Sequence, residues 1–118
     1  MKLAIVGSVR LSIVQHEMAR RLITQVLKTE QPSLVVSGGA PGIDTLAVEI
    51  ACAMGIATKG HQPKVQRWAD GFKPRNIEIA RECDKLVRIV RKQSATYGSG
   101  WTRDYAAGIG KPTQEYEV

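Results

Sequence analysis

Three short segments of the sequence combine glycine with hydroxyl side chains. They are Gly7-Ser8-Val9-Arg10, Ser37-Gly38-Gly39-Ala40-Pro41-Gly42-Ile43-Asp44 and Tyr97-Gly98-Ser99-Gly100-Trp101-Thr102. Glycine lets a backbone come close to an anion, and the amides at the start of a helix donate hydrogen bonds to phosphate groups. The combination therefore favours contact with the phosphate or sugar groups of a ligand.

The second segment is the most informative, because it lies between a predicted strand and a predicted helix. It does not match G-x-G-x-x-G, and it lacks the lysine of a P-loop, so neither motif's chemistry is indicated. The simpler alternative is a tight turn in which glycine supplies a positive φ. Asp44 can cap the helix amides, the more common role, or reach a ribose hydroxyl.

The third segment follows the same logic at a later helix. Ser99 and Thr102 can donate to phosphate, although Thr102 can also be a simple N-cap. Trp101 either stacks on a base or fills the core, and core filling is the more common fate.

Arg75-Asn76 adds charge and an amide at the start of another predicted helix, with a surface ion pair as the alternative role for the arginine. Trp68 precedes this helix and either closes over a cleft or anchors the loop. His16 and His61 show no nucleophile or carboxylate partner in the sequence, so no catalytic role is assigned to either.

Strands and helices alternate in the apolar pattern, which predicts an α/β fold with a mainly parallel sheet of five strands and helices on both faces. The expected strands are 2–6, 33–36, 56–59, 85–90 and 113–118, the last as an edge strand. The expected helices are 12–28, 43–54, 74–83 and 102–108, and 60–73 and 92–100 are expected loops.

Within the first helix, Ser12 and Gln15 fit a capping box, and Val14, Met18, Leu22 and Val26 repeat every four residues. Right-handed crossovers favour the strand order 3-2-1-4-5. The three glycine-containing segments then meet at the carboxyl ends of the strands, where such folds bind ligands.

The composition suits one domain over residues 1–118, with 43% apolar residues. It predicts a cytoplasmic protein with reduced thiols, without a membrane span, a metal site or a cofactor. The net charge is +6, and residues 59–103 hold 11 Lys and Arg against 4 Asp and Glu, a local charge of 11 − 4 = +7. Such a stretch indicates an anionic partner or a solvated basic surface.

The motifs together resemble the SLOG superfamily of Rossmann-like proteins, which includes lonely-guy phosphoribohydrolases, DNA-processing protein A domains and small YspA/YpsA-like members. The matching residues are Gly7-Ser8 with Arg10, Ser37 to Asp44, Arg75-Asn76 with Ile79-Ala80 and Cys83-Asp84, Gly98 to Thr102, Tyr105-Ala106, and Gly110-Lys111-Pro112. The resemblance covers nearly the whole chain and implies a nucleotide-derived ligand held by the glycine-rich loops.

The resemblance implies three functions. The first is a nucleotide-binding module, acting as a sensor or processing domain. The second is a nucleotide N-glycosidic hydrolase, for which Arg75 and Asp104 are the catalytic candidates, because Tyr105 occupies the position of the lonely-guy catalytic glutamate. The third is a single-stranded nucleic-acid binder, with weak, salt-sensitive affinity expected from the basic half. We also expect a homodimer or a higher homo-oligomer.

Overall fold

The computed structural model describes residues 1–92 and 97–118. The strands are β1 (Lys2–Gly7), β2 (Leu34–Ser37), β3 (Ala57–Gly60), β4 (Lys85–Val90) and β5 (Thr113–Glu117). The helices are α1 (Ile13–Glu30), α2 (Ile43–Ala53), the short η1 (Trp68–Phe72), α3 (Lys73–Glu82) and α4 (Tyr97–Gly108).

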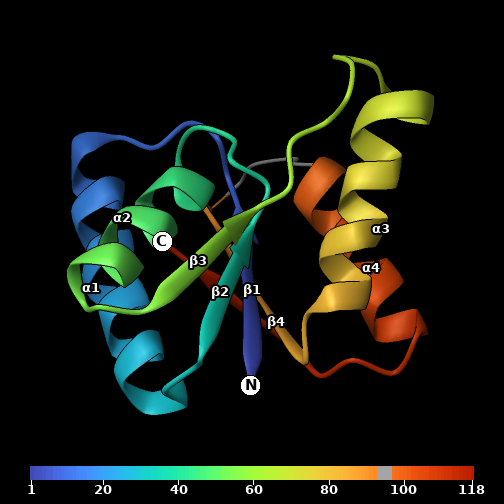
Figure 1. Ribbon diagram of the computed structural model, residues 1–118. Coiled ribbons are helices and arrows are strands. Elements are labelled where there is room, and N and C mark those ends of the chain that lie inside the picture. Colours follow the sequence, from blue (N-terminus) through green and yellow to red (C-terminus); the bar gives the residue numbers. More distant parts are fainter. Residues whose placement is uncertain (93–96) are drawn as a thin grey trace.

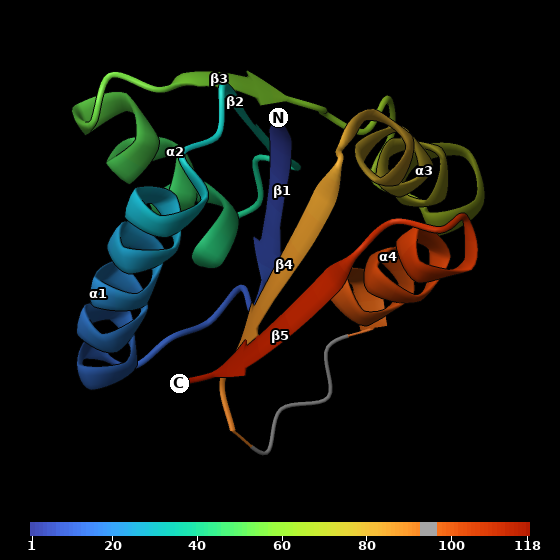
Figure 2. The same ribbon diagram turned by 90° about the horizontal axis from the view of Figure 1, so that it is seen from below.

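The sheet has the order β3-β2-β1-β4-β5, and all of its neighbouring strands run parallel. Helices α1 and α2 cover one face, whereas α3 and α4 cover the other, as Figures 1 and 2 show. The predicted Rossmann-like fold class, strand order and two-sided helix arrangement are confirmed. The order reverses beside β1, so the loops after β1 and β2 and the starts of α3 and α4 meet at one edge.

The core has two parts because alternate strand residues point to opposite faces of the sheet. Leu3 and Ile5 of β1 pack in the cluster beneath α1 and α2, whereas Ala4 and Val6 pack in the cluster beneath α3 and α4. Fully burying a side chain such as Ile5 contributes about 1.5–3 kcal/mol. The strands therefore hold two helix layers in fixed positions around their carboxyl ends.

Helix α1 begins as the sequence predicts, but only the second half of the predicted apolar repeat, Leu22 and Val26, packs against the core. Ser12 accepts from the Gln15 amide at 3.1 Å, and the Ser12 amide donates to the Gln15 side chain at 3.0 Å, which completes the capping box. However, Val14 is 69% exposed and Met18 is 48% exposed. A strict four-residue repeat drifts by about 40° per step on a helix of ~3.6 residues per turn. The buried residues are Ala19, Ile23, Val26 and Leu27.

Helix α4 begins earlier than the sequence predicts, at Tyr97 rather than at residue 102. The expected loop at 97–100 is wrong, and 93–96 lie outside the described residues. Thr102 is consequently not an N-cap, since its hydroxyl donates to the Gly98 carbonyl at 2.8 Å. Two glycines lower the helix propensity of this turn, and a hydrogen bond from Arg88 to Ser99 holds it against β4.

The segment expected as a loop from 60 to 73 also contains a helical turn, η1. It leads directly into α3, which begins at Lys73, one residue before the predicted start. Pro74 lies in the first turn of α3, where a missing amide is tolerated. This arrangement places Trp68 and Arg75 on adjoining turns of chain.

Candidate functional site: a cleft at the carboxyl ends of the strands

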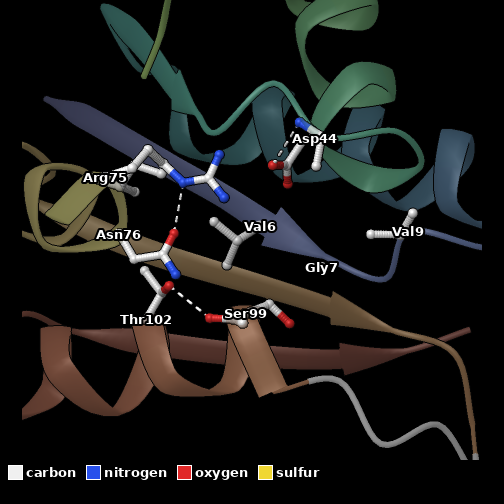
Figure 3. A pocket seen from close by; sticks show the side chains of 11 residues that line it. Val6, Gly7, Val9, Asp44, Arg75, Asn76, Ser99 and Thr102 are labelled. Carbon is white, nitrogen blue, oxygen red and sulfur yellow. Dashed lines mark hydrogen bonds between the residues drawn. The ribbon is translucent and has the colours of Figure 1, made fainter. Parts of the chain in front are cut away.

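A cleft of about 290 Å³ lies beside the carboxyl end of β1, between the loop after β2 and the starts of α3 and α4 (Figure 3). It is lined by Val6, Gly7, Val9, Ala40, Asp44, Arg75, Asn76, Ile79, Gly98, Ser99 and Thr102. The three glycine-containing segments and the Arg75-Asn76 pair all contribute to this one cleft. The apolar wall formed by Val6, Val9 and Ile79 was not predicted.

Asp44 lies at the first turn of α2 and is 6% exposed. Burial raises the pKa of its carboxyl group to about 6, although the Ala40 amide and the Arg75 guanidinium act in the opposite direction. The Ala40 amide donates to Oδ2 at 3.3 Å, and the amides of Gly38 and Gly7 also interact with the carboxylate. Asp44 therefore already supplies the anion that caps this loop.

Arg75 reaches from α3 toward Asp44 across the cleft (Figure 3). Its Nη1 donates to the Gly38 carbonyl at 2.6 Å, and its Nε donates to Asn76 Oδ1 at 2.8 Å. Burial lowers the pKa of the guanidinium, and the Asp44 charge raises it. Among the described residues, the hydrogen bonds of this side chain come from Nε and Nη1.

Close packing explains two of the glycines at the cleft. A Cβ on Gly7 would lie 1.9 Å from the Ile89 carbonyl oxygen, so a side chain would separate β1 from β4. Gly42 has a φ of +81°, and its Cβ would lie 2.3 Å from the Ser8 carbonyl oxygen. Both glycines let the backbone segments of the site pack closely, and of the two only Gly7 also lines the cleft.

Two serines predicted as ligand contacts have structural partners. Ser8 is buried and accepts from the Arg91 amide at 3.1 Å. Ser37 is also buried, accepts from the Gly39 amide at 3.3 Å and donates to the Asp44 carbonyl at 3.3 Å. These hydroxyl groups order the loops that form the cleft.

The remaining predicted contact residues stand back from the cleft. Arg10 and Gly39 are exposed, and an added Cβ on Gly100 would face the Arg88 guanidinium at 3.3 Å. Gly38 and Gly42 contribute backbone to the surrounding loop without lining the cleft. The catalytic candidate Asp104 is an exposed residue of α4 that pairs with Arg103 at 2.9 Å and does not line the cleft.

Arg88 is a buried cation below the start of α4, and sequence reasoning missed it. Its Nε donates to Ser99 Oγ at 3.0 Å, and its Nη1 pairs with Glu115 on β5. The hydrogen bond from Arg88 keeps the pKa of Glu115 below its usual value. A charged residue interrupting the apolar run of β4 was the only sequence signal for this network.

His61 has the carboxylate partners that the sequence did not reveal. Its Nε2 lies 2.6 Å from Glu82, and its Nδ1 lies 3.1 Å from Glu78, both on α3. Hydrogen bonds from Lys59 and His61 lower the pKa of Glu82. The His61 carbonyl oxygen accepts from Arg75 at 3.4 Å, so this cluster supports the cleft from outside.

Among residues 1–92 and 97–118, no helix is long and apolar enough to cross a membrane. The same residues bring together no group of three or more His, Cys, Asp or Glu side chains that could hold a metal ion.

Comparison with known proteins places this geometry in a family. DNA processing protein A (DprA) from Streptococcus pneumoniae matches the structure with a TM-score of 0.75 and 23% sequence identity. The match covers 97% of this chain and 49% of that protein, so this chain spans about half its length. No curated protein matches the sequence. The family model for DNA recombination-mediator protein A matches residues 1–66, which include β1 to β3 and the first two glycine-rich segments. The chain therefore belongs to the DNA recombination-mediator protein A family.

Proposed function

We propose that this chain binds single-stranded nucleic acid and holds one nucleotide of the strand in the cleft. The observation that carries the proposal is the placement of Arg75, a cation that lines a cleft bordered by the first turn of α4. The names of the family and of the similar protein both refer to DNA, which agrees with a nucleic-acid ligand.

The groups that can contact the phosphate are those that do not already donate to Asp44. Because Asp44 takes up the amides of Ala40 and Gly38, the phosphate falls to Arg75 and to the first turn of α4. The first amides of a helix have no acceptor within that helix. Ser99, whose Oγ already accepts from Arg88, lies in this turn and lines the cleft. The cleft's volume lies near the lower end of the ~300–1,000 Å³ range of small-ligand sites, which suits one nucleotide.

The test is fluorescence anisotropy with a labelled 20-nucleotide dT strand at low and physiological salt. We expect a Kd of about 10⁻⁶–10⁻⁴ M at physiological salt, weakening steeply as salt rises, because phosphate contacts release counterions. Arg75→Gln should weaken binding roughly tenfold, about the value of one charge-assisted contact. Arg21→Gln removes the same charge from an exposed position on the opposite face and is the matched control. Equal affinities of the two folded variants would remove the proposal.

A free nucleotide or nucleotide-derived small molecule is an alternative occupant of the same cleft. It would use the same phosphate contacts and could place a ribose hydroxyl against Asp44. Competition decides between the two occupants. A mononucleotide that displaces the strand at equal or lower concentration assigns the cleft to the small ligand, whereas displacement only by longer strands supports the strand.

Hydrolysis of a nucleotide's N-glycosidic bond is the second candidate, and one observation favours it. Asp44 faces the cleft with a pKa raised to about 6 by burial, a value suited to proton transfer near neutral pH. Chromatography of nucleoside monophosphates incubated with the protein between pH 5 and 8 tests this candidate. Release of free base that Asp44→Asn abolishes would establish it, and absence of release at every pH would remove it.

A further inference from the structure

Both tryptophans of the chain lie in one row of aromatic rings, outside the cleft. Trp68 of η1 meets Trp101 of α4 edge to face, with centroids 5.2 Å apart and planes at 87°. Trp101 in turn stacks on Tyr105, with centroids 5.3 Å apart and planes at 19°. We call Trp68, Trp101 and Tyr105 the aromatic row.

Core filling explains only one end of the aromatic row. Tyr105 packs against the core cluster beneath α3 and α4, whereas Trp68 is 43% exposed and Trp101 is partly exposed. A tryptophan that only fills a core has most of its indole surface hidden from water. The exposed part of the Trp68 indole is apolar surface that a ligand can cover. The aromatic row therefore runs from Tyr105, which packs on the core, to Trp68, which is exposed to solvent.

The surroundings of the aromatic row are basic. Arg81 of α3 donates to the Tyr105 hydroxyl at 3.3 Å, and Lys73 at the start of α3 is exposed. Arg67, next to Trp68, pairs with Asp70, and this pair is largely exposed. Exposed pairs are weak and exchange readily for other anions. The three basic residues Arg67, Lys73 and Arg81 belong to the 59–103 stretch with its charge of +7, counted as 11 − 4.

Residues of the aromatic row are close in sequence to residues that line the cleft. Trp101 lies on α4 between Ser99 and Thr102, which both line the cleft. Trp68 lies on η1, which runs directly into the helix that carries Arg75. A strand with one nucleotide in the cleft would therefore meet these rings with its neighbouring nucleotides.

We propose that the aromatic row is a base-stacking surface for nucleotides adjacent to the one held in the cleft, with Trp68 as the ring that a base covers. The inference rests on the proposed function, because it assumes that the strand lies in the cleft and extends from there to the aromatic row. Flat aromatic rings beside cations bind unpaired bases with little sequence preference. Paired bases in a duplex do not offer their faces, so the row selects single strands.

Intrinsic fluorescence tests this directly, because the chain's two tryptophans both belong to the row. The unlabelled protein is titrated with a 20-nucleotide dT strand and with an abasic strand of equal length and charge. Stacking predicts quenching by the dT strand and little quenching by the abasic strand. Equal quenching by both strands would overturn the inference, since charge alone would then account for it.

Variants at Trp68 provide the second readout. Trp68→Leu keeps an apolar side chain without a ring and should weaken dT binding roughly 5- to 150-fold, the range for losing one stacked base. Trp68→Phe should restore most of the affinity. If Trp68→Leu binds dT as tightly as the natural protein while Arg75→Gln does not, the inference fails and the proposed function stands.

The opposite pair of results would keep the stacking surface and reject the cleft. A loss with Trp68→Leu and none with Arg75→Gln would keep the stacking surface and remove the cleft as a strand site. If Trp68→Leu changes the molecular mass in light scattering and leaves dT binding unchanged, the row is a contact between copies of the chain and the inference is overturned. Failure of the natural protein to bind any strand would overturn both.

Discussion

At the scale of single residues, the surroundings of Asp44 determine its chemistry. The sequence offered two roles for this carboxyl group, helix capping and ribose contact. The structure gives it the amides of the glycine-rich loop and also places it in the wall of the cleft. Its raised pKa follows from burial and could not be predicted from the sequence, because burial depends on residues distant along the chain.

Asp44→Asn tests this burial through stability. The pKa of Asp44 is about 6 in the folded chain against 3.8 for a free side chain, about two units, or about 3 kcal/mol. The folded state thus binds this proton more tightly, so Asp44's contribution to stability is full below pH about 4 and decreases up to pH about 6. We expect urea unfolding to show Asp44→Asn gaining up to about 3 kcal/mol relative to the natural protein between pH 4 and 7. A difference independent of pH would contradict the burial.

The sequence alone predicts some of the other site residues and not others. Arg75 could be predicted because a cation beside a helix start is a local pattern. The partners of His61 could not, since Glu78 and Glu82 lie 17 and 21 residues further along the chain. The apolar wall of the cleft was equally hidden, because Val6 and Ile79 resemble ordinary core residues in the sequence.

At the scale of elements, local signals predicted starts of helices better than buried faces. The capping box of α1 is visible in four residues and occurs as predicted. The buried face of the same helix depends on its rotation against β-strands, which the four-residue repeat did not fix. The start of α4 was wrong because glycines favour loops locally, while contacts such as that between Arg88 and Ser99 favour the helix.

The capping box predicts a measurable stability contribution. Ser12→Ala removes the acceptor of the Gln15 amide and should lower the free energy of unfolding by about 1 kcal/mol. Thr24→Ala in the same helix is the control, and it should be neutral or slightly stabilising because alanine has the higher helix propensity. Chemical denaturation measures both, and a Ser12→Ala protein as stable as the natural one would show that the cap contributes nothing.

At the scale of the whole molecule, the alternation of apolar segments was enough to predict the sheet. Each crossover is right-handed by rule, so few strand orders were open, and the order that brings the three glycine-containing segments together is the one found. The sequence did not reveal that the aromatic row and the outer face of α1 are exposed, because exposure depends on how the helices are oriented.

We expect the exposed outer face of α1 to form the interface of the predicted homodimer. Val14 and Met18 lie one turn apart and are 69% and 48% exposed, and two-fold pairing is the commonest way to cover such a face. We expect light scattering to give close to twice the chain mass of 12.9 kDa at high concentration. Met18→Lys should return the mass to that of a single chain, whereas Met54→Lys on α2's end should not. A natural protein of 12.9 kDa at high concentration would contradict the dimer.

A matched pair of α4 variants tests whether the cleft holds a nucleotide of a strand. Among the residues that the structure describes, a Cβ at either Gly98 or Gly108 meets no atom within 4 Å, and of these two glycines Gly98 alone lines the cleft. Leucine at either position should stabilise the helix by up to about 1 kcal/mol. We expect Gly98→Leu to weaken binding of the labelled dT strand at least tenfold, because its side chain enters the cleft, and Gly108→Leu to leave the affinity unchanged. Full affinity in a folded Gly98→Leu protein would contradict it.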